Sequence, residues 1–276
     1  MGMLKISLPD GLSHEYASGT TVGEIVRNAY GKKSGAVAAL VDGEERDFSY
    51  ILEQDCDIEP ILGDTEAGRY ILRHSCAHLL AQAVVEIYPD AQPTIGPPIE
   101  NGFYYDFKMD PVGDGDLKKI EKKMQEHIRA NHTLTREEHD NRTLRDMFAG
   151  NPFKIEIMND KIGMDIGSSA YRQGDFVDLC LGPHVPSTSY LRWFKLTGTS
   201  QAYWKGDNSN ESLVRIYGMC FYSKDELRER ERQIEEAKKR DHKKIGKEME
   251  LYMIDEMIGK GLPVWLPNGE ILKSEI

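Results

Sequence analysis

The sequence has no long hydrophobic run, few cysteines and no excess of basic residues. No apolar stretch approaches the ~18 residues of a membrane span, and the start, Met-Gly-Met-Leu-Lys, lacks the apolar segment of a signal peptide. The 4 cysteines are scattered over 276 residues, so we expect no disulfide framework and a cytoplasmic location. With 35 basic and 46 acidic residues, the net charge of −11 argues against nonspecific wrapping of nucleic acid, although not against a local basic groove.

What the sequence does contain is typical of a globular protein of roughly two domains. Charged residues make up 29% and hydrophobic residues 39% of the chain. The segment 1–62 predicts a small mixed sheet crossed by one helix, with alternation from Leu4 to Leu8 and a turn at 9–11. We expect two further strands in this segment, over 36–41 and 48–52.

Helix signals are clear at three places. Thr21 and Glu24 have the spacing of a capping box, and Gly31 is expected to end the short helix that begins there. A long helix is expected over 66–88, with its apolar residues and two histidines on one buried face. A charged helix is expected over about 115–131.

Two short runs alternate between apolar and polar residues and therefore predict strands. The first run, 153–157, carries Lys154. The second, 176–180, places Asp178 and Cys180 on the same face, because side chains two residues apart in a strand point the same way.

We predict four parts along the chain: a small domain over 1–62, a larger α+β domain over 63–224, a linker helix over 225–250, and 251–276. Between 223 and 250 there are 10 Lys or Arg and 9 Asp or Glu residues, whose helical spacing favours an exposed helix with i,i+4 ion pairs. The last part is too short to be a domain, and we interpret it as the front of a further one.

Two pairs of side chains suggest a site. His74 and His78 are one helical turn apart, and Cys180 and His184 flank Leu-Gly-Pro, which forces a turn. Together these four side chains can build a tetrahedral pocket. Such a pocket can hold zinc, whose preferred ligands are Cys and His, or a small polar substrate and a water molecule.

Two charged residues bear on that choice. Asp178 shares the expected strand face of Cys180, and Lys154 is expected to reach the same pocket. A structural zinc site seldom needs an acid and an amine at its lip, whereas a pocket for an amino group, an ester and a water uses both. The alternative for Lys154 and Asp178 is an ordinary solvated salt bridge.

Several motifs, taken in order, resemble the amino-terminal half of bacterial threonyl-tRNA synthetases. They are His-Ser-Cys-Ala-His, Ile-Gly-Pro followed by Asn-Gly-Phe-Tyr-Tyr-Asp, Asp-Leu-Cys-x-Gly-Pro-His and Ala-Tyr-Trp-x-Gly-Asp. The preceding unit resembles the TGS domain, a ubiquitin-like β-grasp module, and 240–248 with the later Leu-Pro-Asn-Gly resembles the start of the class II catalytic core. The two histidine pairs alone also fit the editing domain of alanyl-tRNA synthetases. Leu181 departs from the arginine of many family members.

This resemblance implies an α+β fold with a β-grasp (TGS) domain and a larger editing domain. It places the ATP-binding motifs, the catalytic zinc ligands and the anticodon-binding domain beyond residue 276, so we expect a chain that edits but does not charge tRNA. The full-length enzyme would use ATP, magnesium and zinc.

The implied reaction is hydrolysis of Ser-tRNA(Thr) to serine and tRNA(Thr). Threonine and serine differ by one methyl group, which a binding pocket discriminates by only about 1–3 kcal/mol. A second pocket that excludes the larger amino acid removes the resulting error.

The resemblance also implies which residues act. We expect Asp178 to anchor the serine ammonium, Lys154 and His74 to lie around the ester, and Cys180 to set the volume that rejects the methyl group. The expected catalytic residues are His74, Lys154, Tyr105 and His184, and the expected substrate-binding residues are Asp178, Cys180 and His78.

The expected partners are the 3′ end and acceptor stem of tRNA(Thr) and the seryl ester, with no membrane and no DNA, and the chain is expected to be a monomer. No metal is expected for editing. If zinc binds, its ligands are His74, His78, Cys180 and His184. Two alternative functions are an acceptor-stem binding module without activity and a zinc-stabilised interaction module.

Overall fold

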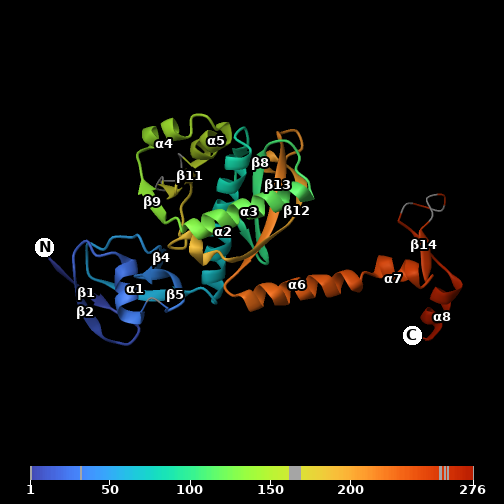
Figure 1. Ribbon diagram of the computed structural model, residues 1–276, viewed down its shortest axis with the longest axis horizontal. Helices are drawn as coiled ribbons and strands as arrows, with labels where there is room; N and C mark the ends of the chain where they lie inside the picture. The colour runs from blue at the N-terminus through green and yellow to red at the C-terminus, as the bar shows by residue number, and fades with distance from the viewer. Residues whose placement is uncertain are drawn as a thin grey trace. The chain divides into compact units, whose positions relative to one another are not determined.

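The computed structural model describes residues 2–31, 33–161, 169–254, 257, 259 and 261–275. Helices and several separate sheets alternate along the chain, which confirms the α+β class (Figure 1). The chain divides into two compact units, Met1–Ser223 and Lys224–Ile276. Within the described residues, no helix is both long enough and apolar enough to span a bilayer.

The first part of the chain is a mixed sheet with one helix packed on it. The strand order is β2-β1-β5-β3-β4, in which β1 and β5 run parallel. The side chains between sheet and helix are apolar, among them Ile6, Ile25 and Ile58. The elements are β1 (Met3–Ser7), β2 (Ser13–Ala17), α1 (Val22–Tyr30), β3 (Ala36–Val41), β4 (Glu44–Arg46) and β5 (Cys56–Leu62).

The expected start and end of α1 are confirmed. The Thr21 hydroxyl accepts from the Glu24 amide, and the Glu24 carboxylate accepts from the Thr21 amide, which completes the capping box. Gly31 ends the helix with φ 78°, a left-handed conformation that glycine adopts without strain.

The strand expected over 48–52 is wrong. The carbonyls of Phe48 and Tyr50 accept from the amides of Gly23 and Val22, which begin α1 and have no partner within the helix. This segment therefore caps a helix, and the remaining strands are β4 and β5. The strand β5 pairs with β1, fifty residues earlier, and no local pattern indicates that pairing.

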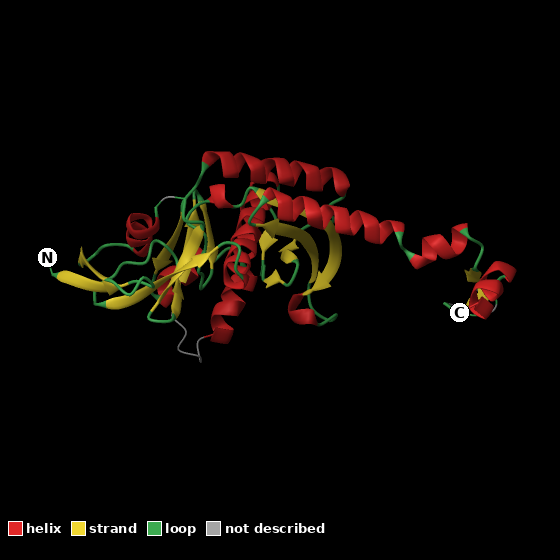
Figure 2. Ribbon diagram, turned by 90° about the horizontal axis from the view of Figure 1, so that it is seen from below, coloured by secondary structure: helices red, strands yellow, loops and turns green. Residues whose placement is uncertain are grey.

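The helix α2 (Glu66–Ile87) is the centre of the first unit, and its bounds confirm the expected helix. It packs on β3 and β5 and also on β8 and β13, so strands lie on either side of it (Figure 2). Every residue from Ser75 to Val84 is buried. The expectation of one buried face is therefore wrong, because sheets cover the helix from more than one direction.

Two more sheets complete this unit. The larger has the order β12-β13-β8-β6 with β7 beside β8, and α3 packs on α2 and β12. The smaller has the order β11-β10-β9. The elements are β6 (Gln92–Pro93), β7 (Pro98–Ile99), β8 (Gly102–Lys108), α3 (Asp114–Ala130), β9 (Leu134–Glu138), α4 (Asn141–Met147), β10 (Ser169–Gln173), β11 (Phe176–Leu179), β12 (Trp193–Tyr203) and β13 (Ser212–Phe221).

The segment 153–157, expected as a strand, is part of the helix α5 (Pro152–Lys161). The Asn151 side chain accepts from the amides of Phe153 and Lys154, as a helix cap does. A proline in the first turn costs no hydrogen bond. The alternation of five residues predicted a strand where the chain forms a helix. The Asn-Pro pair before them, which is typical of a helix start, was the informative signal.

The second unit begins with two helices, α6 (Lys224–Lys239) and α7 (His242–Glu248), where one helix over 225–250 was expected. The break falls at Asp241, whose side chain accepts from the Lys243 amide and so begins a new helix. No described residue of α6 is buried. The unit continues with β14 (Tyr252–Ile254), β15 (Pro263–Trp265) and α8 (Pro267–Glu275).

Candidate functional site

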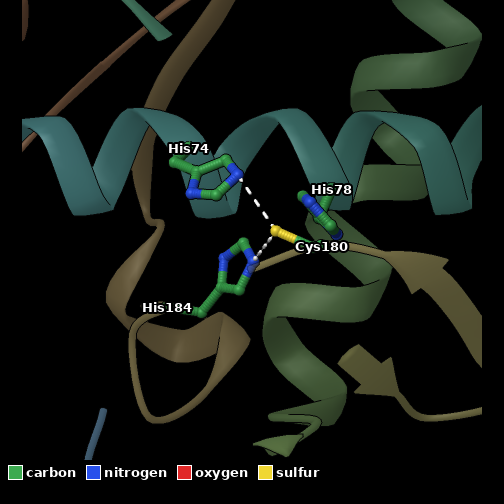
Figure 3. Close-up of side chains that lie close together, drawn as sticks. All are labelled: His74, His78, Cys180 and His184. Carbon is green, nitrogen blue, oxygen red and sulfur yellow. Dashed lines mark hydrogen bonds between the residues drawn. The ribbon is translucent and has the colours of Figure 1, made fainter. Parts of the chain in front are cut away.

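The two pairs of side chains singled out in the sequence converge on one point. His74 and His78 lie one turn apart on α2, Cys180 directly follows β11, and His184 lies in the loop after it (Figure 3). One ligand atom from each lies within 4.8 Å of the others. The Cys180 Sγ is 3.3 Å from His74 Nε2 and 3.2 Å from His184 Nε2. We call these four residues the His/Cys cluster.

A buried group of charged and polar side chains lies against the cluster. The Tyr105 hydroxyl, from β8, donates to Asp178 Oδ2 at 2.6 Å, and Lys154 Nζ lies 2.5 Å from Asp178 Oδ1. Lys154 also donates to the Tyr105 hydroxyl at 3.1 Å. His78 Nδ1 is 3.8 Å from Asp178 Oδ2, which joins this group to the cluster.

The tip of the β12–β13 hairpin holds the helix that carries Lys154. The Trp204 indole donates to the Glu156 carboxylate at 2.9 Å, and its ring lies edge-on to Phe153. Lys205 Nζ is 2.5 Å from Glu156 Oε1. Because Lys154 and Glu156 are two positions apart on a helix, one can reach Asp178 while the other meets the hairpin. The Ala-Tyr-Trp-x-Gly-Asp motif thus fixes α5.

Ser75, which the sequence did not single out, sets the tautomer of His184. Its hydroxyl donates to the Ile71 carbonyl at 2.8 Å, so its oxygen accepts from His184 Nδ1 at 3.0 Å. His184 therefore carries its proton on Nδ1, and its Nε2 lone pair faces Cys180. The same Ser75 oxygen accepts from the Val185 amide, which ties this loop to α2.

The imidazoles are neutral near pH 7. Burial, with a further contribution from His78, lowers the pKa of His74 to about 3, although Asp178 acts in the opposite direction. Burial likewise lowers the pKa of His78 to about 4 and that of His184 well below its ordinary value. Neutral imidazoles can accept protons or bind a metal ion.

Asp178 remains a carboxylate in this interior. Burial alone raises its pKa, but the Lys154 ammonium, His78 and the Tyr105 hydroxyl outweigh burial and lower it. The Leu179 amide also donates to it, at 2.8 Å. Asp178 and Lys154 are almost inaccessible to solvent, whereas His74 and Cys180 are partly exposed. The opening of the site is therefore at His74 and Cys180.

The donor set fits a zinc ion. With zinc bonds of about 2.0–2.3 Å to nitrogen and sulfur, tetrahedral ligand atoms lie roughly 3.3–3.8 Å apart. The Cys180 sulfur is close to this spacing, at 3.2 and 3.3 Å from two imidazole nitrogens, and all four ligand atoms lie within 4.8 Å of one another. Ser75 orients His184 as outer partners orient metal ligands. His74, His78, Cys180 and His184 are the residues that would hold zinc.

The structure brings all seven residues singled out in the sequence into one region. Tyr105, Lys154 and Asp178 form the buried part of the site, and the His/Cys cluster adjoins them through His78. The solvated salt bridge considered for Lys154 and Asp178 is wrong, because both side chains are 3% exposed. Sequence reasoning missed Ser75 and Tyr171, whose ring packs on His184, since neither belongs to a local pattern.

Comparisons with known proteins agree with this arrangement. Residues 169–217, which include Asp178, Cys180 and His184, match the family described as threonyl and alanyl tRNA synthetase second additional domain. The chain is 43% identical to a threonine–tRNA ligase of Staphylococcus epidermidis over 100% of its length, and 44% identical to one of Bacillus velezensis over 99%. Threonine–tRNA ligase 1 of Bacillus subtilis is 43% identical.

In each of these three comparisons the chain spans 43% of the relative's length. Identity at this level extends along the chain and is not confined to the His/Cys cluster. The chain is therefore a homologue of bacterial threonyl-tRNA synthetases over its whole length, and its residues 169–217 match the second additional domain of threonyl and alanyl tRNA synthetases.

Proposed function

We propose that this chain hydrolyses the ester of serine with tRNA(Thr). The observation that carries the proposal is that the His/Cys cluster, with its partly exposed His74–Cys180 edge, meets a buried Lys154–Asp178–Tyr105 group through His78. The similarity to threonine–tRNA ligases supports the substrate class. The proposal covers editing only and includes no step that uses ATP.

The reaction requires a water molecule to attack the carbonyl carbon, after which the bond to the ribose oxygen breaks and that oxygen takes a proton. His74 is neutral and partly exposed, so its imidazole can accept the proton of the attacking water and return it to the ribose oxygen. The Lys154 ammonium, held by Asp178, contributes positive charge near the developing oxyanion. We place Tyr105 and His184 as groups that orient the water and the serine side chain.

Asp178 already has several partners, which bears on how the serine ammonium binds. Lys154, Tyr105 and the Leu179 amide all contact its two oxygens. The serine ammonium can bind Asp178 only if the Lys154 ammonium moves away from one carboxylate oxygen. The two cations then share the Asp178 carboxylate. In the proposed mechanism Asp178 therefore both holds Lys154 and anchors the substrate.

We attribute discrimination against threonine to the close packing around Cys180. The Cys180 sulfur lies between two imidazoles at 3.2 and 3.3 Å, with the Gly182 amide donating to it at 3.3 Å. A methyl group placed there must displace a close-packed atom. Exclusion by overlap is stronger than the about 1–3 kcal/mol available from a missing methyl contact.

The test uses preformed Ser-tRNA(Thr) and Thr-tRNA(Thr) with the full chain. We expect selective release of serine, and a loss of roughly 10²–10⁴-fold in rate for His74→Ala. The matched control is His242→Ala, since the His242 side chain is 81% exposed on α7, and this variant is expected to keep the wild-type rate. Equal cleavage of both esters, or an active His74→Ala variant, contradicts the proposal.

The donor set favours a second candidate, a zinc-stabilised module that binds tRNA or another partner without hydrolysis. Bound zinc would supply a Lewis acid at the cluster. Elemental analysis of the purified chain, combined with the serine-release assay, decides between the two. Stoichiometric zinc that is lost in Cys180→Ser, together with no release of serine, favours the second candidate.

A further inference from the structure

The loop that carries Cys180 and His184 is supported from beneath by Tyr171. Tyr171 lies on β10 opposite Asp178 of β11, and its side chain is buried. Its ring lies edge-on to His184, with centroids 4.4 Å apart. Gly182 has φ +72°, and a Cβ at this position would lie 1.9 Å from the Tyr171 hydroxyl. The loop therefore rests directly on this phenol.

The Tyr171 hydroxyl is held by a residue far away in the sequence. It donates to Asp47 Oδ2 at 2.6 Å, across 124 positions. The other oxygen of Asp47 accepts from the Ser49 amide at 3.0 Å and from the Ser49 hydroxyl at 2.5 Å. Ser49 thus orients the Asp47 carboxylate so that its other oxygen faces the Tyr171 hydroxyl.

Asp47 stands out within the first part of the chain. Among the described residues up to position 62, it is the only buried charged or polar side chain in an otherwise apolar core. A buried carboxylate is costly unless its oxygens have hydrogen-bond donors. One of the donors to Asp47 is the Tyr171 hydroxyl, and the Tyr171 ring packs on His184 of the His/Cys cluster. The hydrogen bond that compensates for burying Asp47 therefore also contacts the residue beneath the cluster.

The start of the loop is tied to β10, because the Cys180 amide donates to the Ser169 carbonyl at 3.1 Å and the Ser169 hydroxyl donates to the Cys180 carbonyl at 2.6 Å. Arg46, Arg136 and Leu181 line a cavity of about 260 Å³ beside the Asp47–Tyr171 contact. The loop is tied to α2 at its far end through Ser75 and Val185. In the middle of the loop, Gly182 packs on the Tyr171 phenol, and the hydrogen bond to Asp47 fixes that phenol in position.

We propose that Asp47 is a positioning residue for the His/Cys cluster, acting through Tyr171 on the loop 180–184. The β-grasp-like part of the chain thereby becomes a structural component of the site. The catalytic consequence rests on the proposed function, because it assumes hydrolysis of the seryl ester. The consequence for loop position is independent of that assumption.

The first readout is alkylation of Cys180 by iodoacetamide, followed by mass spectrometry in the full chain. Cys180 is the only one of the four cysteines that is not buried, so the reagent reports on this loop. We expect Asp47→Ala, which removes the acceptor of the Tyr171 hydroxyl, and Tyr171→Phe each to be alkylated severalfold faster than the wild type. Gly182→Ala, which pushes the loop off the phenol, calibrates the assay. Asp57→Ala, on the exposed surface of β5, is the matched control and is expected to match the wild type.

The second readout is kinetic. Loss of one hydrogen bond to a charged group is expected to lower kcat roughly tenfold, with KM unchanged, because the loop is displaced but the tRNA-binding surface is not. In Asp47→Ala/Tyr171→Phe combined, the effect is expected to equal that of either single variant, since both remove the same bond. Circular dichroism confirms that each variant is folded at the assay temperature.

Wild-type alkylation rates in both single variants overturn the proposal. If the fold-changes of the two single variants multiply in the combined variant, the proposal is also overturned, because such a result indicates independent damage to two regions. A chain that releases no serine refutes the proposed function, while the alkylation rates still decide the role of Asp47.

Discussion

The two interiors of the first unit are built differently. The core of residues 2–62 is apolar apart from Asp47, with Ile6, Ile25 and Ile58 between sheet and helix. The interior around α2 contains His78, His184 and an ion pair almost inaccessible to solvent. Burial of apolar side chains stabilises a fold directly. For a buried ion pair, the attraction between the charges is roughly offset by the loss of their hydration. Under the proposed function, the second interior is arranged for ester hydrolysis at a cost in stability.

The largest expected effect comes from breaking the buried ion pair. Asp178→Ala leaves the Lys154 ammonium without its carboxylate and is expected to lower the free energy of unfolding by about 3–5 kcal/mol. Urea unfolding measures this change. Because the pKa of Asp178 is lowered in the folded chain, its contribution to stability is present above the unfolded pKa and is lost as pH falls through the folded pKa.

Two variants sharpen that test. Asp178→Leu combined with Lys154→Met replaces both charges with apolar groups and is expected to recover most of the lost stability while remaining inactive. Glu235→Ala, in an exposed pair with Lys239, is expected to leave the unfolding midpoint unchanged. If Asp178→Ala and Glu235→Ala have equal unfolding midpoints, the contrast between the interiors is wrong.

The apolar interior predicts a different pattern. Ile58→Ala removes a fully buried side chain and is expected to lower the free energy of unfolding by about 2–5 kcal/mol. At temperatures where the variant is folded, kcat for seryl ester hydrolysis is expected to stay unchanged. Ile51→Ala, at a side chain 55% exposed, is the control and is expected to have little effect. A folded Ile58→Ala variant with impaired kcat would contradict the division of roles.

The smallest effect is expected at the cap of α1. Thr21→Ala removes the hydroxyl that accepts from the Glu24 amide and is expected to cost about 1 kcal/mol. Thr21→Ser keeps that hydroxyl and is expected to retain most of the stability. Thermal unfolding of the two variants, compared with the wild type, provides the measurement. Equal losses in both would assign the effect to the lost methyl group instead of the cap.

Local signals predicted a large part of the fold. The Thr21–Glu24 box, Gly31 and the bounds of α2 depend on residues within one or two turns of each other, so the sequence displays them directly. The failures have tertiary causes. Phe48 lies in a helix cap, and β5 pairs with a strand fifty residues away. At 153–157, a five-residue alternation was too short to outweigh the Asn151 cap.

The site shows the same division. The spacing of His74 and His78 and the turn between Cys180 and His184 were sufficient to predict that the four side chains can meet. The residues that orient them have no such spacing. Ser75 acts because a turn of α2 places it beneath His184, and Asp47 acts only once two sheets have come together.

Burial of the middle of α2 on every side has a consequence for how this protein can change. The positions from Ser75 to Val84 are enclosed by neighbouring sheets, by α3 and by the His/Cys cluster, so a random library across this stretch should return few viable clones. Fluorophores and affinity labels cannot be attached there without disturbing packing. The helix α6, with no buried described residue, offers tolerant attachment points instead.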